Sequence, residues 1–208
     1  YKEQFNKVAP QYQANVNISG GTDRVKYFVS FGYFRQEGIT NAVEYYGSRT
    51  GSTFNRYNFR SNFDINITDN LKITINSAGQ FGETTGPGNS ADPYDLSSRY
   101  KLIMQYIYDS NPFISPGIID GNLIRGFAGI SGTVQNPISA KTDSNIGEQN
   151  ALYNLLTSGS GTIFNSLLDN SIKIEHTMDY IHPNLRAYAT VSYQDNYNRY
   201  VKFTPSIP

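Results

Sequence analysis

Residues 16–38 constrain the fold of this chain more than any other stretch, because they hold two alternating runs joined by a tight turn at residues 20–23. In the second run the odd positions are apolar, and the even positions are mostly hydrophilic or small. The apolar set is Val25, Tyr27, Val29, Phe31 and Tyr33. A repeat of two residues is typical of a strand with one apolar and one polar face. The segment therefore predicts an antiparallel hairpin whose apolar face meets either a packed core or lipid.

The composition bears on that choice. Hydrophobic residues make up 38% of the chain, whereas aromatic residues reach 14% with 17 tyrosines and 12 phenylalanines. Few aliphatic and many aromatic residues suit an alternating surface with rings at an interface better than a close-packed core. The net charge of +0 gives no field that would attract nucleic acid. The absence of cysteine excludes a disulfide scaffold and zinc–thiolate sites.

The order of the predicted connections indicates an up-and-down sheet. Six strands are predicted, at about 11–19, 24–36, 56–68, 71–82, 168–180 and 185–197. Short turns alternate with two long segments, 37–55 and 83–161, and the second contains one predicted helix at about 93–107. All short turns then fall at one end of the sheet and all long loops at the other, as in outer-membrane β-barrels. Hydropathy misses such strands, because half of each strand is polar.

The apolar face also sorts its side chains by position along the strands. Middle positions such as Val16, Phe63 and Ile75 suit a lipid-facing band. The strand ends next to the long loops are aromatic, as an interfacial girdle requires. These girdle residues are Tyr12, Phe31, Tyr33, Tyr57, Phe59, Phe81 and Tyr193. A soluble sandwich has no reason to sort aromatic residues in this way, so the pattern favours an all-β transmembrane barrel segment.

Several motifs resemble one family. Asn-Val-Asn-Ile-Ser-Gly-Gly-Thr-Asp stands at 15–23, Lys-Tyr-Phe-Val-Ser-Phe-Gly-Tyr at 26–33 and Gln-Glu-Gly-Ile at 36–39. Residues 56–65, 111–113, 120–121 and 136–137 fit the same pattern. Together they resemble the SusC/RagA family of TonB-dependent outer-membrane transporters of Bacteroidetes. The resemblance extends over most of the chain and is firmest from 11 to 64.

The resemblance implies a barrel of about 22 strands around a plug domain, in the outer membrane of a Gram-negative cell. Such transporters import oligosaccharides or peptides, draw on TonB, and pair with a SusD-like surface lipoprotein. No plug domain, TonB box or signal peptide is recognisable here, and six strands cannot close a barrel, for which about eight are needed. Residues 1–208 are therefore expected to be part of the barrel domain of a larger protein, with TonB engaged through the missing N-terminal region.

No catalytic constellation emerges, so an enzyme is not expected. His176 and His182 are the only histidines, one in a weak strand and one in a turn. Asp64, Glu175 and Asp179 could be imagined as a glycosidase pair, but inward charges are ordinary lining of a barrel lumen. Residues 143–145 hint at a calcium loop without the glycine and glutamate of an EF-hand, and no cofactor is expected.

The loop aromatics are the better candidates for ligand contact. Sugar rings stack on such side chains, although the same rings could instead pack the loops together or against a partner lipoprotein. The candidates are Tyr45, Tyr46, Tyr94, Tyr100, Tyr106, Tyr108 and Phe113. Two rival functions stay open at this point: a non-transporting outer-membrane barrel such as an adhesin or porin, and a soluble secreted β-sandwich that binds glycans.

Overall fold

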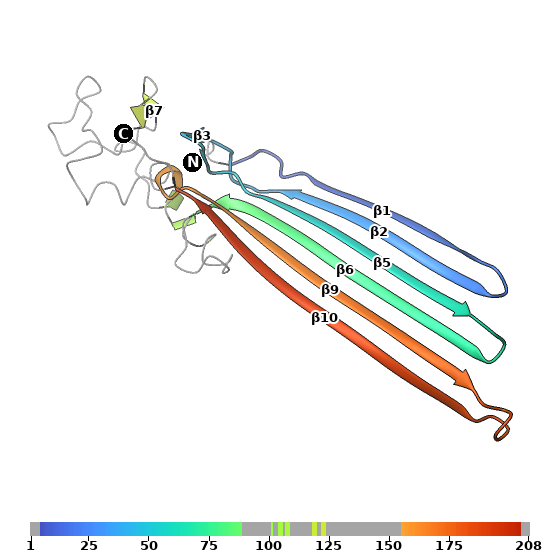
Figure 1. Ribbon diagram of the computed structural model, residues 1–208. Helices are drawn as coiled ribbons and strands as arrows, with labels where there is room; N and C mark the ends of the chain where they lie inside the picture. Colours follow the sequence, from blue (N-terminus) through green and yellow to red (C-terminus); the bar gives the residue numbers. More distant parts are fainter. Residues whose placement is uncertain are drawn as a thin grey trace.

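The computed structural model describes residues 5–88 and 155–204, together with residues 101, 104–105, 107–108, 118–119 and 122–123. Its main element is one antiparallel six-stranded sheet in the order β1-β2-β5-β6-β9-β10 (Figure 1). The strands are β1 (Gln11–Gly21), β2 (Val25–Glu37), β5 (Thr53–Asn66), β6 (Leu71–Pro87), β9 (Ser160–Thr177) and β10 (Arg186–Phe203). Chain neighbours among the six are neighbours in the sheet, which confirms the predicted all-β, up-and-down architecture.

All three short turns lie at one end of the sheet, which we call the turn end, and the long connections lie at the loop end (Figure 1). In the first turn the Thr22 amide donates to the Val25 carbonyl at 2.6 Å. The strand bounds predict a turn between β9 and β10 at 181–184, whereas it runs from Met178 to Leu185. Asn184 has a φ of 66°, and its amide donates to Asp179 Oδ1 at 3.0 Å. Side-chain capping of this kind replaces the missing ladder bonds.

Four strands reach further toward the loop end than their alternation predicts. β5 begins at Thr53 instead of 56, and β9 begins at Ser160 instead of 168. β6 continues to Pro87 instead of 82, and β10 continues to Phe203 instead of 197. The extensions of β6 and β9 are rich in Gly, Ser and Thr and do not alternate, so pattern reading stops short of them. Backbone pairing continues there regardless, from Gly82 opposite Asn165 to Pro87 opposite Ser160.

The predicted polar loop 37–55 contains a small hairpin of β3 (Glu44–Tyr45) and β4 (Ser48–Arg49). Tyr46 and Gly47 join these strands with φ values of 48° and 78°. Positive φ at both central residues is the signature of a two-residue type I′ turn. A second two-residue pair, β7 (Ile118–Ile119) with β8 (Asn122–Leu123), also lies in the long loop region. Of the helix predicted at 93–107, the described residues 101, 104–105 and 107 are helical.

The buried apolar residues among those described gather at the loop end. They are Ile107, Leu155, Leu156 and Ile163. Phe5 packs against Ile107 and Leu155, and the Asn6 side chain donates to the carbonyls of Gly38 and Thr40 at 2.9 and 3.0 Å. The small core therefore fastens the N-terminal segment and the loops to the strand ends. It does not underlie the sheet.

No second sheet covers the six strands within the described part of the chain. Large apolar side chains in the middle of the strands are consequently open, with 72% of Val191 and 48% of Ile172 exposed. A soluble sandwich would bury such side chains against an opposing layer, which the described residues do not form. None of the described helical residues belongs to a helix long and apolar enough to cross a membrane.

Candidate functional site

The strand register divides the sheet into two chemically distinct faces. Residues that oppose each other across an antiparallel pair share a face. The apolar face consists of the even positions of β1 and β9 and the odd positions of β2, β5, β6 and β10. The polar face consists of the remaining positions of these strands. One continuous row of the apolar face runs through Gly20, Tyr27, Phe63, Ile75, Ile172 and Val191.

All seven predicted girdle residues occupy the apolar face. Tyr33 and Tyr57 form a ring pair with centroids 5.1 Å apart, and Phe59 stacks with Phe81 at 6.3 Å. Tyr12, Tyr57 and Phe81 each lie nine positions from the last pair of their hairpin, whereas Phe31 lies five positions from it. Phe31 is therefore deeper than the rest of the set. Tyr197 shares the face in the row of Tyr33, Tyr57 and Phe81, and the sequence analysis missed it.

The three hairpins end at different levels of the sheet, with a constant offset between neighbouring hairpins. The last pairs of the three hairpins are Gly21–Lys26, Asn66–Lys72 and Thr177–Arg186. Lys26 lies opposite Asp64, so the second hairpin extends two residues further than the first, to Asn66. Lys72 lies opposite Glu175, so the third hairpin again extends two residues further, to Thr177. The offset is therefore one residue per strand. One residue rises about 3.3 Å, and neighbouring strands lie about 4.8 Å apart. If the three turns share one plane, the strands tilt by about 35° from its normal, within the range of barrels.

The charge-free zone of the apolar face has the height of a membrane band. Between the third and seventh position from the turn end, all six strands carry uncharged residues on this face. Arg35, Glu83, Asp195 and Arg199 appear on it only from the ninth position onward, and His176 lies at the first. The eight residues that separate the first position from the ninth, inclined by about 35°, span about 22 Å. Outer-membrane barrels have an apolar band about 25 Å tall.

Three polar residues lie within this zone, in one row across β5, β6 and β9. They are Ser61, Ser77 and Asn170. Ser77 Oγ donates to Asn170 Oδ1 at 2.6 Å, so two of the three satisfy each other. Pairing of this kind lowers the cost of placing polar groups in an apolar environment.

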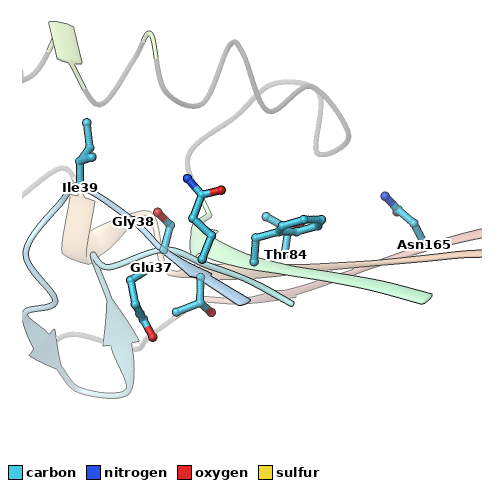
Figure 2. A pocket seen from close by; sticks show the side chains of 9 residues that line it. Glu37, Gly38, Ile39, Thr84 and Asn165 are labelled. Carbon is cyan, nitrogen blue, oxygen red and sulfur yellow. The ribbon is translucent and has the colours of Figure 1, made fainter. Parts of the chain in front are cut away.

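A pocket of about 480 Å³ opens at the loop end, where the sheet meets the loop that follows β2. Its lining residues are Gln36, Glu37, Gly38, Ile39, Ser52, Thr53, Phe54, Thr84 and Asn165. Figure 2 shows Thr84 and Asn165 rising from one side of the strands, with Glu37 turned to the other. The pocket thus offers amides and hydroxyls around one aromatic ring. The volume lies within the range of small-molecule sites, roughly 300–1,000 Å³.

The floor beside the pocket is stiffened by aromatic packing that the sequence analysis missed. Phe34 and Phe54 meet edge to face with centroids 5.9 Å apart, and the Arg56 guanidinium lies 5.2 Å above the Phe34 ring. All three side chains lie on the polar face, on β2 and β5. Phe34 interrupts the alternation of β2, and such an exception on a polar face is the signal that could have found the cluster.

The structure places three of the seven predicted loop contacts. Tyr45 and Tyr46 sit in the hairpin of β3 and β4 with ring centroids 4.7 Å apart, and 56% of Tyr46 is exposed. Tyr108 is 82% exposed and follows the buried Ile107. Tyr94, Tyr100, Tyr106 and Phe113 lie outside the described residues, as do residues 143–145 of the possible calcium loop. The placed tyrosines do not line the pocket.

The titratable residues have ordinary structural contacts. The His176 ring lies 2.9 Å from the carbonyl oxygen of Asn70, and the His182 ring lies 3.0 Å from that of Pro183. Asp64 and Glu175 share the polar face and pair with lysines, while Asp179 caps the last turn. Within the described ranges, no three His, Asp or Glu side chains gather as a metal site would require.

Sequence comparisons supply independent information. No family model matches the chain. TonB-dependent receptor P26 of Formosa agariphila is 42% identical over 64 residues, which are 31% of this chain and 6% of that protein. TonB-dependent receptor P3 of the same organism is 26% identical over 127 residues, which are 61% of this chain and 11% of that protein. The chain thus matches only a small part of each relative's length. With the sheet described above, these similarities confirm at the level of TonB-dependent receptors the resemblance that the sequence carries: the chain is similar to a short part of such receptors.

Proposed function

We propose that this chain forms part of the wall of an outer-membrane β-barrel importer of the TonB-dependent kind, without catalytic activity. The single observation that carries the proposal is the charge-free zone that all six strands share on the apolar face between the first and ninth positions from the turn end. At a tilt of about 35° this zone is about 22 Å tall. In this arrangement the apolar face meets lipid and the polar face lines the lumen. The turn end faces the periplasm, and the loop end faces the outside of the cell.

The girdle tyrosines and phenylalanines then lie at the outer membrane–water boundary. An aromatic side chain there keeps its ring in the apolar zone, and tyrosine also keeps its hydroxyl in contact with water. Arg35 and Glu83, which share the apolar face, come at the same height or above it, where headgroups and water solvate charge. The order of apolar, aromatic and charged positions along a strand supports this orientation.

The finer proposal is a SusC/RagA-type importer in a Bacteroidetes outer membrane. It takes up oligosaccharides or peptides, is driven by TonB, and works beneath a SusD-like lipoprotein. The motifs at 15–23 and 26–33 support the family. The exposed Tyr46 and Tyr108 and the pocket around Phe54 support a loop end built for contact with substrate or lipoprotein. A barrel that does not transport is the alternative that the experiment has to separate.

Deletion of the gene that contains this sequence is the direct test of transport. We expect the deletion strain to lose growth on one oligosaccharide or peptide class from a panel, while growth on free monosaccharides and amino acids is unchanged. A strain that lacks TonB should lose growth on the same class, and complementation with the intact gene should restore it. Unchanged growth and uptake across the panel would favour an adhesin or porin and contradict the importer.

A further inference from the structure

The pocket at the loop end continues into a part of the polar face that carries almost no charge. Three register rows cross the six strands there, through the even positions of 54–58 on β5, and we call them the loop-end rows. Arg56 is the only charged residue that the described strands place in these rows. In the next row toward the turn end Arg60 and Asp169 offset each other, and the next row toward the loop end holds Lys202. Arg56 therefore meets no carboxylate of the strands in its own row or in the two rows beside it.

Arg56 is held in place next to the pocket by aromatic packing. Its guanidinium lies 5.2 Å from the centroid of the Phe34 ring, which meets Phe54 edge to face. Arg56 Nε is buried and has no hydrogen-bond partner among the described residues. On β6, Gly82 lies opposite Arg56 and adds no side chain. A Cβ there would stand 3.7 Å from Phe54 and 3.9 Å from Asn165, which both line the pocket. The row of Arg56 therefore passes beneath the pocket, and no side chain on β6 separates the arginine from it.

A fixed arginine without a carboxylate beside it favours an oxyanion as ligand. The guanidinium presents N–H donors in a planar fork, which matches the oxygens of a carboxylate or a sulfate. Glu37 is the one carboxylate among the described lining residues, and Arg35 Nε already donates to Glu37 Oε1 at 2.8 Å. The pocket therefore offers a positive charge that its own acidic residue does not neutralise. Partial enclosure strengthens the attraction relative to an open surface.

The other side chains of the loop-end rows indicate what kind of molecule carries the acidic group. Most of the polar ones are amides, which donate and accept hydrogen bonds as sugar hydroxyls do. They are Gln11, Gln13, Asn15, Gln36, Asn58, Gln80, Asn165, Asn196 and Asn198. The strands place no carboxylate in these rows that could bind the amino terminus of a peptide. We propose that the pocket and the loop-end rows bind an acidic oligosaccharide, whose hydroxyls meet the amides and whose carboxylate or sulfate meets Arg56. The inference rests on the proposed function, since it names the substrate class of that importer.

The growth panel of the deletion strain tests the substrate class when its oligosaccharides are grouped by charge. The groups are neutral, uronate-containing and sulfated oligosaccharides, with peptides as a fourth group. We expect growth to be lost on the uronate-containing or the sulfated group, and these two arms identify the acidic group. Loss confined to neutral oligosaccharides or to peptides would contradict the inference and leave the importer intact. Unchanged growth on all four groups would contradict the proposed function as well.

The substitution Arg56→Gln tests the role of the arginine itself. Calorimetry on the complete protein in detergent measures binding of the acidic oligosaccharide on which the deletion strain fails to grow. The Kd should rise by at least about tenfold, as expected when a hydrogen bond to a charged group is lost. Arg56→Lys keeps the charge and should raise the Kd less. The matched control Arg186→Gln removes an arginine from the same face at the turn end and should leave the Kd unchanged. Equal Kd values for Arg56→Gln and Arg186→Gln would overturn the inference.

A change in the ligand tests the same contact without any change in the protein. Methyl esterification of a uronate, or removal of a sulfate, neutralises the acidic group and leaves the sugar hydroxyls in place. The unsubstituted protein should bind the neutralised oligosaccharide at least about tenfold more weakly than the acidic one. A rise in salt should weaken binding of the acidic form more than binding of the neutralised form. This comparison decides the matter if Arg56→Gln fails to fold, and equal affinity for the two forms would overturn the inference.

Discussion

The substitution Ile75→Arg is expected to cost the barrel about 2–4 kcal/mol of folding free energy, the range measured for a cation near the middle of a lipid-facing band. Ile75 lies on the apolar face of β6, between Phe63 on β5 and Ile172 on β9. It is three positions from the last pair of its hairpin, within the charge-free zone. An arginine there has to leave the apolar zone or be buried without a partner, and both are unfavourable.

The neighbouring substitution Asn76→Arg is the matched control. Asn76 is the next residue of the same strand but lies on the polar face, opposite Asn62 and Ser171. An arginine at this position points to the lumen, so the free energy of folding should change by less than about 1 kcal/mol. Urea titrations of the complete protein in lipid vesicles, followed by tyrosine fluorescence, measure both values. Equal losses would mean that the faces have been assigned the wrong way round.

The substitution Gly159→Ala should cost about 3 kcal/mol, because two unfavourable terms add. Gly159 precedes β9 and has a φ of 81°, a conformation that residues with a Cβ rarely adopt. An added Cβ would also fall against the backbone carbonyl of Phe203, which cannot rotate away as a side chain could. The join between β9 and β10 at the loop end should therefore open, and it should become a site of rapid hydrogen exchange and proteolysis.

Gly82→Ala serves as the control for that prediction. A Cβ at Gly82 would stand 3.7 Å from the Phe54 ring and 3.9 Å from Asn165, which is ordinary contact. The free energy of unfolding should therefore change by less than about 1 kcal/mol. Alanine also restricts the unfolded chain, which acts to stabilise the folded state. A denaturant titration that ranks Gly82→Ala as the more damaging change would contradict the described packing at the loop end.

The sequence predicts those parts of the fold in which the polarity of each side chain follows from whether its face of the sheet meets water. β5 alternates from Tyr57 to Asn66 with one exception, Ser61, because one of its faces meets water and the other does not. The short turns follow from their Gly, Asp and Asn residues. The up-and-down order then follows from the alternation of short and long connections.

The parts that the sequence misses are those in which the backbone determines the structure. The first eight residues of β9, Ser160 to Leu167, pair with β6 and β10 although their side chains do not alternate. The hairpin of β3 and β4 depends on positive φ at Tyr46, which is unusual for tyrosine and gives no pattern. The stack of Arg56 on Phe34 and the pocket beside Phe54 arise only when β2 and β5 are in register.

The central claim is that alternate residues of each strand meet lipid, and a spin-label scan along β6 tests it most directly. The chain contains no cysteine, so single cysteines at positions 72–77 give unique labels within it. In the complete protein in lipid vesicles, accessibility to oxygen, which concentrates in lipid, should peak at positions 73, 75 and 77. It should be low at 72, 74 and 76. Accessibility without a repeat of two residues, or with peaks at Thr74 and Asn76, would contradict the account.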